Sequence, residues 1–263
     1  MRNYDYFYRQ MIQWQLSRMI QVWQLSRMMQ FVTSRARRCA CLVIIISHFS
    51  FLITHSASAQ TRQEWRDSLE TLSASLKKDP NNVDLRLRKA EADIQLEQWD
   101  YALAEYGRIL RADEKNLAAL YFRAYVHERQ KHYDLARVDY ESFLAIQPVH
   151  LEARLGLAHV LQKMGRKQDT ADELNRIVQM FPDSADAYAA RAAYETEQQQ
   201  YELALFDWGE AIRLKPDNAG FTVSKVDLLL RLGRKREARE ALDALVSKGT
   251  PRGTLKEWYD RTK

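Results

Sequence analysis

Small, large and polar positions recur along the chain with a period of 34 residues from residue 83 onward. Five units follow in register, at residues 83–116, 117–150, 151–184, 185–218 and 219–252. The eighth and twentieth positions of each unit hold small or β-branched residues, whereas the twenty-fourth holds a large one. Small positions let two helices approach and large ones fill the space beside them. The pattern therefore predicts two helices in close contact within each unit.

These columns are read directly from the sequence. Position eight holds Ala90, Ala124, Ala158, Ala192 and Val226, and position twenty holds Ala102, Ala136, Thr170, Ala204 and Ala238. Position twenty-four holds Tyr106, Tyr140, Leu174, Trp208 and Leu242. Polar turns such as "QKHYD" separate the two predicted helices, and Pro148, Pro182 and Pro216 follow the second one. Proline cannot continue a helix, so these residues mark where units end.

This pattern closely resembles the tetratricopeptide repeat, a helix–turn–helix unit of 34 residues. The resemblance implies an all-α, right-handed α-α superhelical solenoid of about five such units with capping helices. Residues 60–82 match only the second helix of a repeat and are predicted to form an N-terminal capping half-repeat. Residues 253–263 form a predicted C-terminal capping helix that would place Leu255 and Trp258 against the last repeat.

Charged residues replace the apolar ones that the family usually has at positions seven and eleven of the first helix. Lys89 with Asp93, and Arg191 with Glu195, are spaced i,i+4, so opposite charges can meet on one helix face. We interpret them as partly buried ion pairs between repeats rather than as a ligand site.

The first 59 residues form a separate segment. Residues 28–59 contain arginines, the apolar run "CLVIIISHFSFLI" and the small-x-small site Ala57-Ser58-Ala59, which together predict a secretory signal peptide cleaved near Ala59-Gln60. A membrane anchor is the alternative, although a span needs roughly 20 apolar residues. Residues 1–27, in which "WQLSRM" occurs twice, are interpreted as a mis-annotated or repetitive leader; a membrane-surface helix is the alternative.

Cleavage would change both charge and chemistry. Residues 1–59 hold seven arginines and one acidic residue, so the remaining chain has 33 basic and 34 acidic residues, a net charge of −1. The basic balance of the whole chain is thus no sign of nucleic-acid binding. Cys39 and Cys41 leave with the leader, and no apolar run long enough to span a membrane remains. We expect an exported protein, periplasmic or secreted.

The family resemblance also implies a binding surface. First helices of tetratricopeptide repeats line the concave groove, with positions two, five, nine, twelve and thirteen facing it. Tyr121 and Tyr125 lie one helical turn apart, and aromatic residues with a polar tip are favoured at interfaces. The alternative is that both tyrosines pack between neighbouring repeats. The candidate partner-binding residues are Tyr121, Tyr125, Glu128, Arg129, Leu155, His159 and Lys163.

No catalytic or metal-binding pattern accompanies this surface. We expect no metal site from His150 and His159 at the groove rim, because no third ligand accompanies them, and the sequence has no phosphate loop or nucleophile elbow. We therefore expect no enzyme activity, no cofactor and no metal. The predicted function is a non-catalytic scaffold or adaptor that binds a peptide or protein in its concave groove. The alternative is a structural subunit of a cell-envelope complex, assembled through its convex face or its ends.

Overall fold

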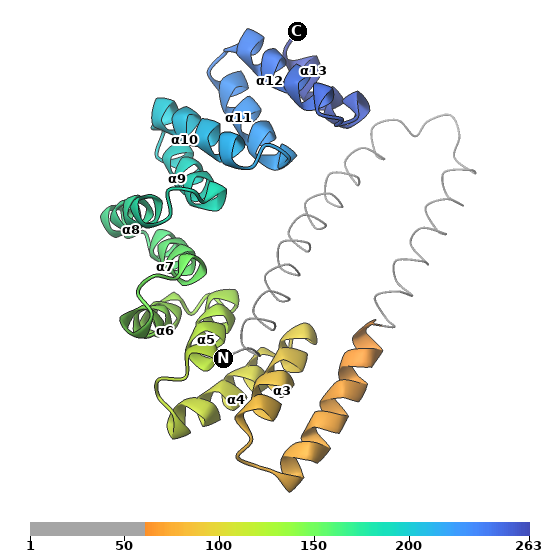
Figure 1. The fold of residues 1–263 in the computed structure, drawn as a ribbon, viewed down its shortest axis with the longest axis vertical. Helices are drawn as coiled ribbons and strands as arrows, with labels where there is room; N and C mark the ends of the chain where they lie inside the picture. The colour runs from red at the N-terminus through yellow and green to blue at the C-terminus, as the bar shows by residue number, and fades with distance from the viewer. Residues whose placement is uncertain (1–60) are drawn as a thin grey trace, which may run out of the picture. The chain divides into compact units, whose positions relative to one another are not determined.

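The structure, a computed structural model, describes residues 61–263. The leader, the signal peptide and the cleavage site lie outside these residues. The described residues divide into two compact units between Ile109 and Leu110. Every regular element among the described residues is helical, so the predicted all-α solenoid fold is confirmed (Figure 1). None of the helices in this part of the chain is both long enough and apolar enough to cross a lipid bilayer.

The described part of the first unit contains a helix at residues 61–78, then α3 (Val83–Gln95) and the greater part of α4 (Trp99–Ala112). Leu72 is buried on the 61–78 helix. The small residues Ala90 and Ala102 are fully buried on α3 and α4. Their burial is what close packing of two helices requires.

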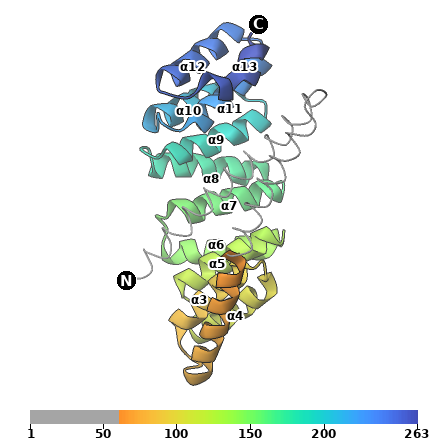
Figure 2. The ribbon, with the colours of Figure 1, turned by 90° about the vertical axis from the view of Figure 1, so that its right-hand side faces the viewer.

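The second unit consists of four helical hairpins followed by a short C-terminal segment, which Figure 2 shows stacked one after another. The hairpins are α5 (Leu117–Arg129) with α6 (Tyr133–Ile146), α7 (Leu151–Lys163) with α8 (Lys167–Met180), α9 (Ala185–Glu197) with α10 (Tyr201–Leu214), and α11 (Ala219–Arg231) with α12 (Lys235–Ser247). Each hairpin occupies one 34-residue unit of the sequence.

Contacts between hairpins decide which helices share a face. Each second helix packs on the first helix of the next hairpin, and the first helices α5, α7 and α9 also contact one another in sequence. In Figure 1, α5 and α7 accordingly lie on one side of this unit and α6 and α8 on the other. We call the surface of α5, α7 and α9 the first-helix face, and that of α6, α8 and α10 the second-helix face.

The last residue of each repeat caps the next one. Side chains at position thirty-four accept a hydrogen bond from a backbone N–H in the first turn of the following helix, which leaves one fewer unpaired donor there. The capping residues are Asn82, Asn116, His150, Ser184 and Asn218.

The turn within each hairpin contains one residue in the left-handed backbone conformation. It always occupies position fifteen, and its φ lies between 61° and 73°. The residues are Glu97, Lys131, Gly165, Gln199 and Gly233. Only two of them are glycine, the residue that adopts this conformation without steric cost.

The C-terminal segment forms a 3₁₀ turn, η1 (Arg252–Leu255), and the short helix α13 (Lys256–Arg261). Leu255, Trp258 and Tyr259 are buried in one cluster with residues of α11 and α12. Trp258 Nε1 donates a hydrogen bond to Asp227 Oδ1 at 2.9 Å. The segment therefore covers apolar surface of the last hairpin.

Candidate functional site

The seven candidate residues lie on two helices in contact. Tyr121, Tyr125, Glu128 and Arg129 are on α5, whereas Leu155, His159 and Lys163 are on α7. Because α5 and α7 contact each other on the first-helix face, the structure brings these residues into one region of the second unit. Their role in binding stays a prediction.

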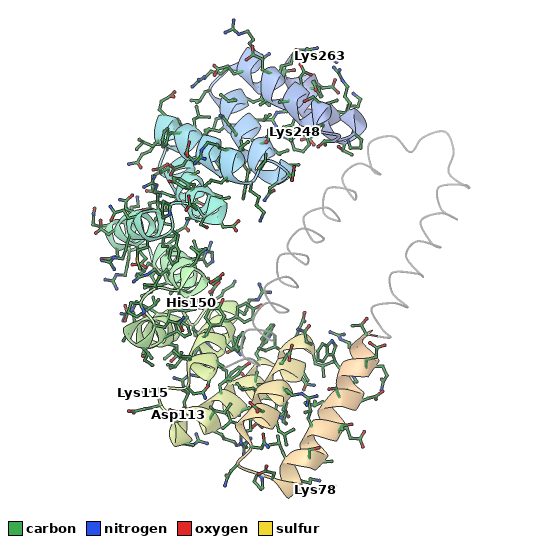
Figure 3. All side chains as sticks on the ribbon, viewed as in Figure 1. Lys78, Asp113, Lys115, His150, Lys248 and Lys263 are labelled. Atoms are coloured by element: carbon green, nitrogen blue, oxygen red, sulfur yellow. The ribbon has the colours of Figure 1, made fainter. Side chains whose placement is uncertain are left out.

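Tyr121 takes part in an aromatic cluster. Its ring lies 5.9 Å from that of Tyr140, 5.8 Å from Phe143 and 6.0 Å from His150. His150, labelled in Figure 3, caps α7, and its Nδ1 accepts from Ala153 N at 3.2 Å. These contacts join α6 to the start of α7, so the packing alternative fits Tyr121.

Glu128 is the polar centre of this region. Tyr140 donates its hydroxyl to Glu128 Oε2 at 3.1 Å, and His159 Nε2 lies 3.7 Å from Glu128 Oε1. Burial raises the pKa of Glu128 to about 7, although Tyr140, Arg129 and Lys163 act in the opposite direction. Burial also lowers the pKa of His159. A carboxyl group with a pKa near 7 therefore lies beside an imidazole that favours its neutral form.

A glycine makes the Tyr140–Glu128 contact possible. A Cβ added to Gly156 on α7 would lie 2.5 Å from Tyr140 Cζ and 2.8 Å from its hydroxyl oxygen. Any larger side chain would occupy the space through which the phenol passes. The sequence pattern placed Tyr140 among the large residues at position twenty-four and predicted only packing. Gly156 in the next repeat was the signal that the Tyr140 side chain extends past α7 toward Glu128.

The remaining candidates differ in exposure. Leu155 is half-buried and packs against a core cluster containing Ala158 and Leu174, whereas Arg129, His159 and Lys163 are exposed. Beside them, Gln162 Nε2 donates to Glu197 Oε2 of α9 at 2.5 Å. The candidate residues therefore combine one half-buried apolar side chain, Leu155, with exposed charged side chains.

A column of buried acids at position twenty-three was missed from the sequence. Each acid pairs with a cation on the first helix of its own repeat, at position four or seven. The shortest pairs are Arg86–Glu105, Arg123–Asp139, Arg154–Glu173 and Arg191–Asp207, each at 2.6 Å. The signal was the column itself, which reads Glu105, Asp139, Glu173 and Asp207 before Ala241 in the last repeat.

The predicted placement of ion pairs between repeats is wrong for the residues named. Lys89 Nζ does contact Asp93 Oδ2 at 3.1 Å, but it also contacts Glu105 of the same repeat at 3.3 Å. Arg191 lies 3.9 Å from Glu195, whereas it forms two hydrogen bonds to Asp207 at 2.6 and 2.9 Å. For Arg191 the nearer acid, Asp207, lies on the second helix. These ion pairs therefore connect the two helices of one hairpin.

Two open depressions lie away from the candidate residues. One open depression of about 570 Å³ is lined by the turn Lys131–Leu135 and Met164, and a second, about 400 Å³, is lined mostly by charged residues of α6, α7 and α8. Neither includes a candidate residue. Within residues 61–263, no group of three or more His, Cys, Asp or Glu side chains is arranged to hold a metal ion.

Comparison with known proteins identifies the repeats. Two models described as tetratricopeptide repeat match residues 87–149 and 128–194. Among curated proteins, the chain is 28% identical over 193 residues to DnaJ protein P58IPK homolog B of Oryza sativa subsp. japonica. That match covers 68% of this chain but 36% of the rice protein, so the chain spans about a third of the relative's length. Human protein O-mannosyl-transferase TMTC1 is 31% identical over 140 residues, which cover 51% of this chain and 14% of that protein.

Solved structures share the fold. A tetratricopeptide repeat protein from Parabacteroides merdae superposes with a TM-score of 0.57 at 20% identity, covering 77% of this chain and 79% of that one. MamA from Desulfovibrio magneticus RS-1 gives 0.55 at 18% identity, covering 63% and 93%. YrrB, described as having an unusual peptide-binding site, gives 0.51 at 17% identity, covering 68% and 92%. The chain therefore has the solenoid fold of these proteins, and its similarity to the tetratricopeptide repeat extends over residues 87–194.

Proposed function

We propose that this protein is a non-catalytic scaffold that binds a peptide or protein partner on its first-helix face. The observation that carries the proposal is that Glu128 of α5 lies beside His159 and Lys163 of α7, with Tyr125 three residues before it on α5. Aromatic and charged side chains beside an apolar one are typical of surfaces that bind extended segments. The fold supports it, since stacked helical repeats provide elongated binding surfaces.

The two depressions described above lie away from the candidate residues, which is compatible with such a partner. Small-molecule sites are concave pockets that enclose their ligand, whereas a peptide or protein segment lies across a shallower surface. The peptide-binding site named for YrrB supports the same class of ligand by analogy of fold. We further propose that the protein acts after export, in the periplasm or outside the cell, because of the signal-peptide pattern at residues 28–59.

A second candidate function has its own supporting observation. Leu135 and Val138 on α6, and Leu203 and Phe206 on α10, are exposed on second helices, with Phe206 65% exposed. The equivalent positions on α8 are Asp169 and Asp172. Exposed apolar residues grouped on one face favour protein contacts. A structural subunit assembled through its second-helix face is therefore the alternative.

Two matched aromatic truncations distinguish these functions. Peptides are selected from a displayed random library with the purified chain, and their affinities for variants are measured by fluorescence polarisation. Tyr125→Ala should weaken binding by at least about fivefold, equivalent to about 1 kcal/mol, because it removes an aromatic anchor from the first-helix face. Phe206→Ala, the control on α10, should leave the affinity unchanged.

Circular dichroism melts of both variants verify that they fold. The reverse result, in which Phe206→Ala weakens binding and folded Tyr125→Ala does not, would reject the first-helix face and favour the alternative. A stability loss of roughly 3–5 kcal/mol in Tyr125→Ala would show that Tyr125 is a core residue instead of a contact residue.

A further inference from the structure

Glu128 has a free side from which a ligand can approach. Tyr140 holds Oε2, but an ionised carboxylate has about four acceptor positions, and this hydrogen bond fills one. His159 Nε2 lies 3.7 Å from Oε1, beyond hydrogen-bond distance. The Glu128 side chain is 20% exposed, so part of it can be reached from solvent.

No lysine or arginine among residues 61–263 lies within 4.0 Å of this carboxylate, and burial makes His159, the base that does, favour its neutral form. Lys163, the last residue of α7, acts on Glu128 through space but forms no ion pair within 4.0 Å among residues 61–263. The hydrogen bond from Tyr140 fixes the position of Glu128. Tyr140 is itself buried, and its ring lies against Gly156 of α7. A partly desolvated, well-positioned acceptor without a direct cation is complementary to a cation supplied from outside.

An aromatic side chain accompanies the carboxylate. Tyr125 precedes Glu128 by three residues on α5, so the two side chains are neighbours on one helix face. A guanidinium can pair with a carboxylate through parallel hydrogen bonds and stack on a tyrosine ring, whereas an ammonium behaves as a point charge. The combination fits arginine better than lysine.

We infer that Glu128 and Tyr125 form a subsite for an arginine side chain of the partner. This inference rests on the proposed function, since it specifies the chemistry recognised on the first-helix face. The subsite would give the partner a fixed register, because Tyr140 and Gly156 hold the carboxylate at one place along the stack. It also requires the ionised form of Glu128.

The pH dependence follows from the groups that face Glu128. These are Arg129 on α5, Tyr140 on α6, and His159 and Lys163 on α7. With a Glu128 pKa of about 7, the ionised fraction rises about tenfold between pH 6 and pH 8, and the apparent affinity for a cation should rise by the same factor. Burial lowers the pKa of His159 below 6.5, and the loss of its positive charge as the pH rises works in the same direction.

The probe is N-acetylarginine methylamide, compared with the isosteric but uncharged N-acetylcitrulline methylamide. Binding to the purified chain is followed by NMR titration at pH 6 and pH 8. We expect the arginine probe to bind at least tenfold more tightly than the citrulline probe at pH 8. Glu128→Gln, which keeps an acceptor for Tyr140, should abolish this preference and the pH dependence.

Asp186→Asn is the matched control, because it removes one negative charge from the exposed start of α9. It should bind the arginine probe as the unaltered chain does. Equal loss in both variants would overturn the inference and indicate a diffuse charge effect. Tighter binding of N-acetylaspartate methylamide than of the arginine probe would also overturn it, since Lys163 would then be the recognition element. Library peptides that require Tyr125 but bind equally to Glu128→Gln would overturn this inference alone and leave the proposed function standing.

Discussion

At the scale of single residues, position fifteen of each repeat imposes a conformation that most side chains resist. Glu97, Lys131 and Gln199 take the left-handed conformation with φ of 61°, 64° and 63°. For an L-residue this conformation costs roughly 1–2 kcal/mol because Cβ approaches the following carbonyl oxygen. Repeat three and repeat five avoid the cost with Gly165 and Gly233.

Opposite substitutions at this one position should change stability in opposite directions. Lys131→Gly should raise the free energy of unfolding by up to about 1 kcal/mol, since relief of strain exceeds the added entropy of the unfolded chain. Gly165→Ala should lower it by about 1 kcal/mol, although a Cβ there would meet no atom within 4 Å. Urea denaturation followed by circular dichroism measures both. A destabilised Lys131→Gly would show that the lysine makes a compensating interaction.

Residue-scale chemistry was the part least accessible from the sequence. The sequence interpretation paired the charges at positions seven and eleven by the i,i+4 rule, which considers only one helix. Arg191 instead binds Asp207, sixteen residues away on α10. Glu195 consequently keeps one buried oxygen without a hydrogen-bond partner, and burial raises its pKa to about 7. Such choices depend on side-chain geometry between two packed helices.

At the scale of the helical element, α7 has a glycine in its interior where alanine would ordinarily be preferred. Gly156 leaves room for the Tyr140 ring from the preceding hairpin. Gly209 in α10 provides a contrast, since an added Cβ there would meet only Lys225 Nζ, at 3.6 Å. The same residue type thus has a packing role in one helix and no comparable role in the other.

The two glycines should therefore respond differently to alanine. Gly209→Ala should stabilise the protein by about 0.5–1 kcal/mol, the usual helix-propensity gain. Gly156→Ala should destabilise it by roughly 1–3 kcal/mol, because Tyr140 must move and the core is overpacked. Thermal melts compare the two variants. Tyr140→Leu should reduce the cost of Gly156→Ala, and equal gains from both alanines would refute the close approach of Tyr140 to α7.

The positions of the helices could be predicted from the sequence more completely than the contacts within the candidate site. The columns of small and large residues predicted two helices per unit, and the structure places α5 to α12 in that register. The sequence also grouped Tyr121 with Tyr125, but only the structure shows Tyr121 among Phe143 and His150. A 34-residue period specifies which helix face a side chain occupies. It does not specify which neighbour the side chain turns toward, because that depends on volumes in adjacent repeats.

At the scale of the whole molecule, the proposed export gives a measurable change in charge and mass. The full chain has a net charge of +5 and an isoelectric point near 9.1. Removal of residues 1–59 would leave a net charge of −1 and no cysteine. The basic character therefore belongs to the segment that the signal-peptide prediction removes.

Mass spectrometry of the exported protein should find a chain that begins at Gln60, cyclised or not, and unreactive toward thiol reagents. Isoelectric focusing should give it an isoelectric point well below that of the full chain. An Ala59→Asp variant should accumulate uncleaved, since the small-x-small site is lost. Recovery of the intact chain from membranes, with no shorter form, would contradict export by cleavage.

The capping of each first helix by the last residue of the preceding repeat has a consequence for how repeats are exchanged. A segment cut at residues 117–150 carries the cap of the next helix, His150, but leaves its own cap, Asn116, behind. The piece that retains its own helix start runs instead from Asn116 to Val149. Duplication, deletion or transplantation of whole repeats should preserve folding best when the joint falls one residue before the apparent boundary. The segment that carries all the residues for its own first helix is therefore shifted by one position from the unit that the sequence period defines.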